Sequence, residues 1–404
     1  MLKAMTAQIR EIDDVSSAVS ALLAQLDMEK GLRGNSVGIL TCGPDFVGSG
    51  VVKALCEKLP FDVVGAAATD AAALGGLSVL SLIVLTSDDV LFSAALSRPL
   101  DRENSGDAAR DVCLSALKGL LNPDGSPSPD LTAPAESFEK CVLGLTVIPF
   151  MQWSEGDEIL GFLDEATGGV PLFGMRTTEI ASVGSPVLFN GEAYFDRLAV
   201  VLLSGNVRAR FAAVSIMEHK VAKYCALVTG SERNILKTVD DIPIAEYLEK
   251  FGLAEKGRLR WKSSIPLLVD RGDGSRPTSV VILDQTPEGY VRMGASVPLN
   301  STIRIGSIDR GDVLESVSDI TGIAGRETGA FLFFSCALRG FTLDLDGTTE
   351  RDRVRETLGD SVPYLFAYTG GEICPLYVQG GQTINRFHNM TAIGCALNSS
   401  ELKL

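Results

Sequence analysis

The sequence has few of the residues from which metal and redox sites are usually built. Its only histidines are His219 and His388, and its eight cysteines include no C-x-x-C pair. A structural zinc site needs four such ligands at short spacings, whereas cysteines scattered among apolar neighbours are typical of reduced core thiols. We therefore expect no metal, no other cofactor and no disulfide.

Positive charge and long apolar runs are also scarce. Lysine and arginine number 36 against 51 aspartates and glutamates, which gives a formal net charge of −15, and no basic cluster offsets it. Such a chain repels phosphate backbones, so we expect no nucleic-acid partner. The longest apolar runs, such as Leu82–Leu85 and Leu198–Leu203, are far shorter than the ~18 residues of a membrane-spanning helix.

The start of the chain lacks the features of a targeting segment. Residues 1–8 have no continuous apolar stretch behind their lysine, so they resemble neither a signal peptide nor a lipid anchor. A high negative charge favours solubility. We expect a soluble, cytoplasmic protein without membrane insertion.

The length of the chain predicts two domains, because single hydrophobic cores stop growing near ~250–300 residues. We place them at residues 1–235 and 236–404 of the 404. The first is predicted to be an α/β domain built from two pseudo-repeats, over residues 12–99 and 105–214, each with the order helix, strand, helix, strand, strand.

Sequence matches between the two halves of the first domain indicate the repeat. The matching pairs are residues 36–41 with 142–146, 63–70 with 172–179, and 82–87 with 200–205. Within the middle pair, Gly65 matches Gly174, Thr69 matches Thr178 and Asp70 matches Glu179. Residues 123–130, rich in proline, serine, glycine and aspartate, are interpreted as a surface loop inserted in the second copy.

The second domain is predicted to be α+β. Its apolar runs are shorter and alternate more with polar residues, as in strands with one exposed face. Helical patterns are few, mainly residues 312–319 and 350–358, the latter ending at Gly359.

Three short polar clusters end or interrupt strand-like runs in the last quarter of the chain. They are Ser335–Gly340, Tyr368–Ile373 and Phe387–Thr391. Buried Arg, Glu, His and Asn side chains are costly unless they have partners, so these clusters beside Phe331–Phe334 suggest a recognition site. If the strands pair, we expect the three clusters to lie together at the opening of one site.

Arg339 and Glu372 are the most informative pair in these clusters. A guanidinium binds a carboxylate through two parallel hydrogen bonds, and a carboxylate binds an ammonium, so together the two side chains suit a small zwitterion such as an amino acid. The alternative is that they form an internal salt bridge with each other, because buried charges are usually paired.

The same region permits an enzymatic interpretation. Cys336 as nucleophile, His388 as base, and Asn389 or Glu372 as orienting group would form an activated thiol. A packed thiol is the commoner role for a cysteine at the end of an apolar strand, so we favour a protein that is not an enzyme. A scaffold that binds only proteins is a third possibility.

The C-terminal motifs resemble those of one known family. Phe333–Arg339, Ala367–Ile373 and His388–Thr391 are similar, in that order, to the strand end, the turn and the closing strand of the FIST C-terminal domain. Residues 35–215 resemble the FIST N-terminal domain more diffusely. Leu338 stands where the family usually has glycine or alanine, a departure that would narrow a pocket.

The resemblance implies a sensory module, because FIST domains are regarded as cytoplasmic sensors that bind small ligands such as amino acids and act in signal transduction. No output domain is recognisable in the chain, so a separate signalling protein is the implied partner. The residues expected to bind the ligand are Ser335, Cys336, Arg339, Tyr368, Gly371, Glu372, His388, Asn389 and Thr391.

Overall fold

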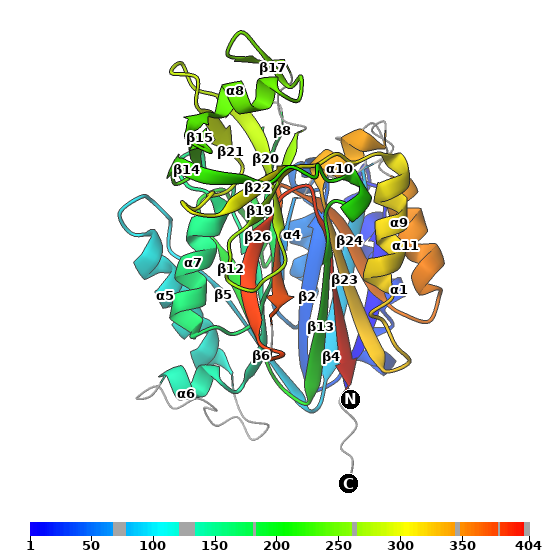
Figure 1. The fold of residues 1–404 in the computed structure, drawn as a ribbon. Coiled ribbons are helices and arrows are strands. Elements are labelled where there is room, and N and C mark those ends of the chain that lie inside the picture. The colour runs from blue at the N-terminus through cyan, green and yellow to red at the C-terminus, as the bar shows by residue number, and fades with distance from the viewer. Residues whose placement is uncertain are drawn as a thin grey trace.

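The computed structural model describes residues 1–67, 78–120, 134–180, 183–260, 265–343, 348–378 and 380–399. Thr69 and Asp70 of the predicted repeat, and the predicted loop at residues 123–130, lie outside the described residues. Most of the chain forms three large sheets and a small barrel (Figure 1).

The first sheet is formed by the N-terminal part of the chain. Its order is β1 (Lys3–Ile9), β4 (Leu80–Ser87), β2 (Asn35–Cys42), β3 (Val63–Ala66), β10 (Val187–Phe189) and β11 (Glu192–Tyr194). The apolar runs predicted as strands are buried along their whole length, as in β3 and β4. Strands that are apolar on both faces need a cover on both sides.

The second sheet combines strands from both ends of the sequence. Its order is β26 (Thr383–His388), β25 (Gly371–Tyr377), β7 (Leu172–Arg176), β6 (Cys141–Ile148), β12 (Ala199–Gly205) and β5 (Val90–Leu96). The third sheet has the order β13 (Val207–Val214), β27 (Ala392–Ser399), β23 (Thr328–Cys336) and β24 (Tyr364–Thr369).

One pairing pattern occurs in all three sheets. β2, β6 and β23 each lie parallel to one neighbour, which is β3, β7 and β24 respectively. Each also lies antiparallel to a strand on its other side, namely β4, β12 and β27. That strand then pairs antiparallel with β1, β5 or β13. β5 and β13 therefore lie in a different sheet from β4 and β12, the strands that precede them in the chain.

The three sheets enclose one apolar core and are covered outside by helices. Ile39, Leu145 and Leu332, from the first, second and third sheets, belong to the shared inner core. The outer faces pack against α1 (Val15–Leu26) and α4 (Val51–Cys56), against α5 (Ser105–Gly119) and α7 (Gly156–Thr167), and against α9 (Arg310–Thr321) and α11 (Thr349–Leu358). Figure 1 shows α5 and α7 on one side of the molecule and α9 and α11 on the other.

The small barrel stands on one end of the sheets (Figure 1). Its strands are β14 (Ala226–Glu232), β22 (Thr302–Ile305), β19 (Pro266–Asp270), β20 (Thr278–Gln285), β21 (Val291–Met293) and β15 (Ile235–Val239), and pairing of β14 with β15 closes the ring. β16 (Ile242–Pro243) and α8 (Ile244–Glu249) are attached to it. The boundary predicted between residues 235 and 236 falls at the first residue of β15, inside this barrel.

Shorter elements complete the described chain. They are α2 (Met28–Gly31), α3 (Pro44–Gly48), α6 (Pro134–Phe138), α10 (Ala337–Thr342), a 3-10 turn at Glu218–Lys220, and the two-residue strands β8 (Glu179–Ile180), β9 (Val183–Gly184), β17 (Ala254–Glu255) and β18 (Arg258–Leu259). None of the helices in the described parts of the chain is long and apolar enough to cross a membrane. The helices predicted at residues 312–319 and 350–358 are confirmed as α9 and α11.

Two glycines allow the parallel strand pairs to approach closely. A Cβ atom on Gly65 in β3 would lie 1.8 Å from the carbonyl oxygen of Leu40, and one on Gly174 in β7 would lie 1.9 Å from that of Thr146. Both contacts are with backbone of the neighbouring strand, which a rotamer change cannot relieve. The two positions therefore require glycine.

We predict that Gly174→Ala lowers the free energy of unfolding by about 3 kcal/mol or more, because the added methyl group forces β6 and β7 apart. The matched control is Gly161→Ala, at an exposed position in α7 where a Cβ meets nothing within 4 Å. That control should raise the free energy of unfolding by up to about 1 kcal/mol, because alanine has a higher helix propensity than glycine. Urea denaturation measures both, and equal effects would contradict the proposed close approach.

Candidate functional site

The end of β23 brings the predicted polar clusters together. Ser335 and Cys336 pair with Tyr368 and Thr369 at the end of the parallel strand β24. The amide of Cys336 also donates to the carbonyl of Thr391, 3.0 Å away, just before β27. Strands β23 and β24 run in the same direction, so their polar ends meet at one edge of the sheet.

Arg339 lies fully buried in α10, one turn after this edge. Its guanidinium donates to the Glu350 carboxylate, with Nη2 3.0 Å and Nε 3.3 Å from Oε1. Nη2 also donates to the Ser316 hydroxyl at 2.6 Å and to the Val313 carbonyl at 3.2 Å. Ser335 donates to the same carboxylate.

The partner of Arg339 is therefore Glu350 of α11, which corrects the expectation of an internal salt bridge between Arg339 and Glu372. Both side chains of the pair are 0% exposed. Glu350 could not be singled out from the sequence, because it stands in a charged stretch that is typical of a solvated helix face. α9 is fixed for this contact by a capping box in which Asp309 and Asp312 hydrogen-bond each other's backbone amides.

Glu372 is the second buried charge at the strand ends. Its Oε1 accepts from the Thr369 hydroxyl at 2.7 Å, and burial raises its pKa well above the ordinary value. The Thr391 amide and the Cys336 thiol lie near the carboxylate and favour its charged form, but neither makes a well-aligned hydrogen bond to Oε2. Arg339 acts on Glu372 only through its field, without a direct ion pair among the described contacts.

The enzymatic interpretation requires an activated Cys336 thiol and a His388 base, and the pKa shifts of both groups oppose these roles. Burial, and then the neighbouring Glu372, raise the pKa of the Cys336 thiol, whereas a nucleophilic cysteine needs a lowered one. Burial lowers the pKa of His388 to about 4, and its Nε2 lies 3.1 Å from the Cys374 carbonyl oxygen. No hydrogen bond or ion pair among the described residues joins these two side chains. The eight cysteines, all within the described parts of the chain, are not paired in disulfides.

The remaining predicted residues have mainly local partners. Thr391 donates to the Asn389 carbonyl at 2.8 Å, and Asn389 Nδ2 donates to the His388 carbonyl at 3.1 Å. Tyr368 is buried, with its ring edge-on to Phe366. Gly371 lies under the Phe387 ring, which a Cβ atom would meet at 2.2 Å. Asn389 faces the barrel, where its Oδ1 approaches Gly294.

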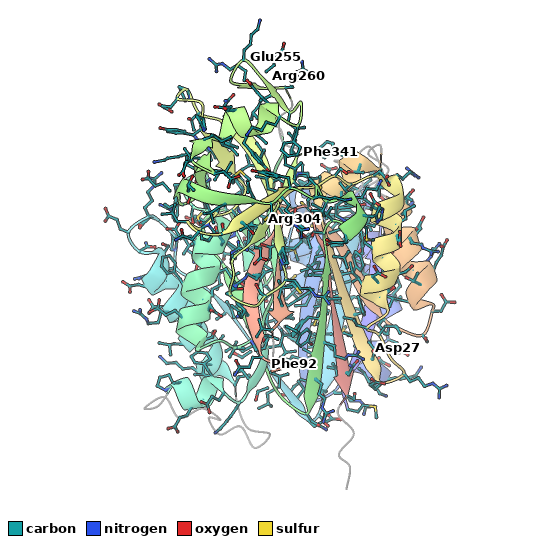
Figure 2. All side chains as sticks on the ribbon, viewed as in Figure 1. Asp27, Phe92, Glu255, Arg260, Arg304 and Phe341 are labelled. Carbon is teal, nitrogen blue, oxygen red and sulfur yellow. The ribbon has the colours of Figure 1, made fainter. Side chains whose placement is uncertain are left out.

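A groove of about 700 Å³ opens between α10 and the barrel. From the barrel side it is lined by apolar residues including Phe251, Ile265 and Ile305, and from the sheet side by Leu338, Phe341, Thr342 and Met390. Phe341 is 58% exposed and projects where α10 meets the barrel (Figure 2). Leu338 and Met390 are the chain neighbours of Arg339 and Asn389, so the groove adjoins the buried polar cluster. No group of three or more potential metal ligands occurs among the described residues.

We predict that Glu350→Ala lowers the free energy of unfolding by about 3–5 kcal/mol, because it leaves the Arg339 guanidinium buried without its counter-ion. The control removes Glu356 from its pair with Arg353 on the same helix, where the two side chains are 63% and 44% exposed. Glu356→Ala should cost less than about 1 kcal/mol. Denaturant titration compares them, and a small effect at residue 350 would show that the buried ion pair contributes little.

We also predict a pH dependence that His388→Gln removes. Because its folded-state pKa of about 4 lies below the ordinary 6.5, the unfolded chain takes up the proton first. The stability that neutral His388 contributes is complete above the unfolded pKa and is lost as the pH falls towards about 4. Between about pH 7 and about pH 4.5 the wild type should lose about 2–3 kcal/mol more than the variant.

The control for this comparison is His219→Gln, which removes an imidazole that is 64% exposed and should follow the wild type. Glu372, whose pKa is raised, has a dependence of opposite sign that is common to all three proteins. Parallel wild-type and His388→Gln curves would contradict the buried neutral imidazole.

Comparison with solved structures finds remote likenesses. A cyanuric acid hydrolase from A. caulinodans aligns over 99% of this chain and 100% of its own, with 8% identity and a TM-score of 0.34. PurLQS from Thermotoga maritima aligns over 99% of this chain and 73% of its own, with 8% identity and a TM-score of 0.20. At these TM-scores neither likeness supports a statement about this chain. The comparison with curated proteins gave no match.

The family models match most of the sequence. The FIST N domain matches residues 36–242 and the FIST C domain matches residues 244–375. FIST domains are in general sensory domains of signal-transduction proteins and are thought to bind small ligands. The resemblance to FIST proteins is thus confirmed for both halves of the chain, and the chain belongs to the FIST family.

Proposed function

We propose that this protein is a cytoplasmic sensor that binds a small polar metabolite, such as an amino acid, and acts through a separate signalling protein. One observation supports this proposal most strongly. Arg339 Nη1 and Glu372 Oε2 are buried, belong to a guanidinium and a carboxyl group, and have no hydrogen-bond partner among the described residues.

Unpartnered atoms of this kind are costly. Burying a polar atom without a hydrogen bond costs about 1–3 kcal/mol, and more when the group is charged. A small guest with a hydrogen-bond acceptor for Arg339 and a donor for Glu372 would recover that cost on binding. Because Glu350 already neutralises Arg339, the guest's main ionic contact is with Glu372.

The groove beside the cluster supplies a route and a means of signalling. A ligand that enters between Leu338 and Ile305 touches both the sheet side and the barrel side of the groove. Binding that fits one relative position of the two sides better than another shifts the population towards it. The exposed ring of Phe341 lies on this rim, where a partner protein would detect the shift.

The repeated strand pairing supports the predicted repeat of residues 12–99 and 105–214, and it extends the repeat to a third copy. β2, β3 and β4 correspond in pairing to β6, β7 and β12, and also to β23, β24 and β27. Gly65 and Gly174 make the same close backbone approach in the first two copies. The proposed sensor site lies in the third copy.

We predict that an amino-acid and metabolite screen finds a compound that raises the melting temperature, and that Glu372→Gln weakens its binding about tenfold or more. Leu338→Trp, which fills the groove, should weaken it as well. An ammonium placed beside Glu372 favours the ionised carboxylate, whose pKa is raised by burial, so binding should release a proton.

Calorimetry in two buffers of different ionisation enthalpy measures that proton. The matched control is Glu356→Gln, which removes an exposed carboxylate of α11. Unchanged affinity in both Glu372→Gln and Leu338→Trp would exclude this site.

A further inference from the structure

A second group of buried polar side chains lies between the second sheet and the barrel. Four atoms in it have no hydrogen-bond partner among the described residues: Arg176 Nε, Asp157 Oδ1, Ser279 Oγ and Asn389 Oδ1. They come from the end of β7, the first turn of α7, strand β20 and the residue after β26. The set contains one cationic donor, two acceptors and a hydroxyl.

Arg176 is the cation of this group. It is 5% exposed, and its guanidinium lies over the Phe150 ring, 4.4 Å from the centroid. Its Nη2 makes only long hydrogen bonds, 3.3 Å to the Ser154 carbonyl and 3.5 Å to that of Met151. No carboxylate of the described residues forms an ion pair with it. Burial lowers the pKa of Arg176, and the fields of Glu155 and Asp157 act in the opposite direction.

Asp157 is held in place by one of its two oxygens. Oδ2 accepts from the Ser296 amide of the barrel at 2.8 Å, which leaves the buried Oδ1 for another partner. Glu155, at the start of the same helix, is already engaged because its Oε1 accepts from Asn234 at 2.7 Å. Asp157 also interacts with the half-buried Arg271 through its charge.

Asn389 and Ser279 form the opposite side. The amide of Asn389 donates to the Ser279 carbonyl at 3.1 Å, and Asn389 Oδ1 approaches Gly294, two residues before Ser296. In the second sheet, Arg176 of β7 pairs with Gly371 of β25. The next residue of β25, Glu372, pairs with His388 of β26, and Asn389 follows His388 in the chain. Arg176, the last residue of β7, and Asn389, the first residue after β26, therefore lie at the same end of the two strands that flank β25.

This group is distinct from the Glu372 site. Successive residues of a strand point to opposite faces of a sheet, so Glu372 and the row of Arg176 and Gly371 face opposite ways. On the face of Arg176, Phe387 and Ile373 belong to the core under α5 and α7. On the face of Glu372, Met175 and Cys374 belong to the core shared by the three sheets.

We propose that Arg176, Asp157, Asn389 and Ser279 bind a small carboxylate whose neighbouring carbon carries a hydrogen-bond donor, either an ammonium or a hydroxyl group. The free Nε of Arg176 binds a carboxylate oxygen. The free oxygens of Asp157 and Asn389 accept from the donor group, and the Ser279 hydroxyl binds either part. A bare inorganic anion fits less well because it brings its charge to Asp157.

The position of this site gives the ligand a structural effect. Arg176 and Asp157 lie in the segment matched by the FIST N domain, and Ser279 lies in the segment matched by the FIST C domain. A molecule bound by all three side chains fixes the barrel against the second sheet. The site is thus suited to a ligand that stabilises one placement of the barrel, independently of the groove beside α10.

L-alanine, L-lactate and propionate test the proposal, because they share a carbon frame and a carboxylate but carry an ammonium, a hydroxyl group or neither. For the full chain we expect alanine or lactate to raise the melting temperature and to bind at least about tenfold more tightly than propionate. Arg176→Gln should abolish the shift. Asp157→Asn keeps a hydrogen-bond acceptor for the Ser296 amide. It should weaken the binding of alanine about tenfold and the binding of lactate much less.

Controls separate this site from other causes. Arg110→Gln and Asp107→Asn alter an exposed pair on α5, 57% and 67% exposed, and should leave the shifts unchanged. The lactate shift separates the two sites, because lactate carries no ammonium for the ionic contact with Glu372, whereas Arg176→Gln should abolish that shift. If Arg176→Gln does not fold, Asp157→Asn decides through the alanine-to-lactate ratio. No shift with any of the three compounds, or equal shifts in wild type and Asp157→Asn, would overturn the proposal.

Discussion

Three sheets share one apolar core, and this constraint determines where polar chemistry can occur. The inner faces of the sheets meet around residues such as Leu145 and Leu332, and the outer faces lie under helices, so central strands such as β4 and β6 are apolar on both sides. A charged side chain of the central strands finds room at the strand end. Cys336 ends β23, Arg176 ends β7 and His388 ends β26, and these are the places where the buried polar groups gather.

Burial explains the shifted pKa values of the titratable side chains at these strand ends. Glu372 and His388 face each other across β25 and β26, and burial disfavours the charged form of both. The charge of Arg339 is balanced by the Glu350 carboxylate. Its guanidinium also donates to two further oxygen acceptors, the Ser316 hydroxyl and the Val313 carbonyl. Arg339 has a counter-ion at contact distance, whereas Glu372 accepts from the Thr369 hydroxyl and has no ion-pair partner among the described residues. This difference is the reason for proposing Glu372 as the ionic contact of a guest.

The sequence predicted the strand-end clusters and the family, because both depend on local motifs that keep their order along the chain. It did not predict the partner of Arg339. Glu350 and Glu372 lie 11 and 33 residues beyond Arg339, and only the packing of α11 against α9 selects the nearer one. Arg176 and Asp157 were missed for a related reason. Arg176 follows an ordinary apolar run and Asp157 precedes one, so neither stands out in the sequence. They lie near Asn389 because β25 and β26 pair into the same sheet as β7, which precedes β25 by nearly two hundred residues.

The exchange of strands between sheets has a mechanical consequence. β4 and β5 are consecutive in the chain yet belong to the first and second sheets, and β12 and β13 connect the second sheet to the third in the same way. Short turns at residues 88–89 and 206 thus link neighbouring sheets through the chain itself. The sheets cannot slide past one another without straining these turns, so together they form a stiff base, and compliance is left to the barrel that stands on it.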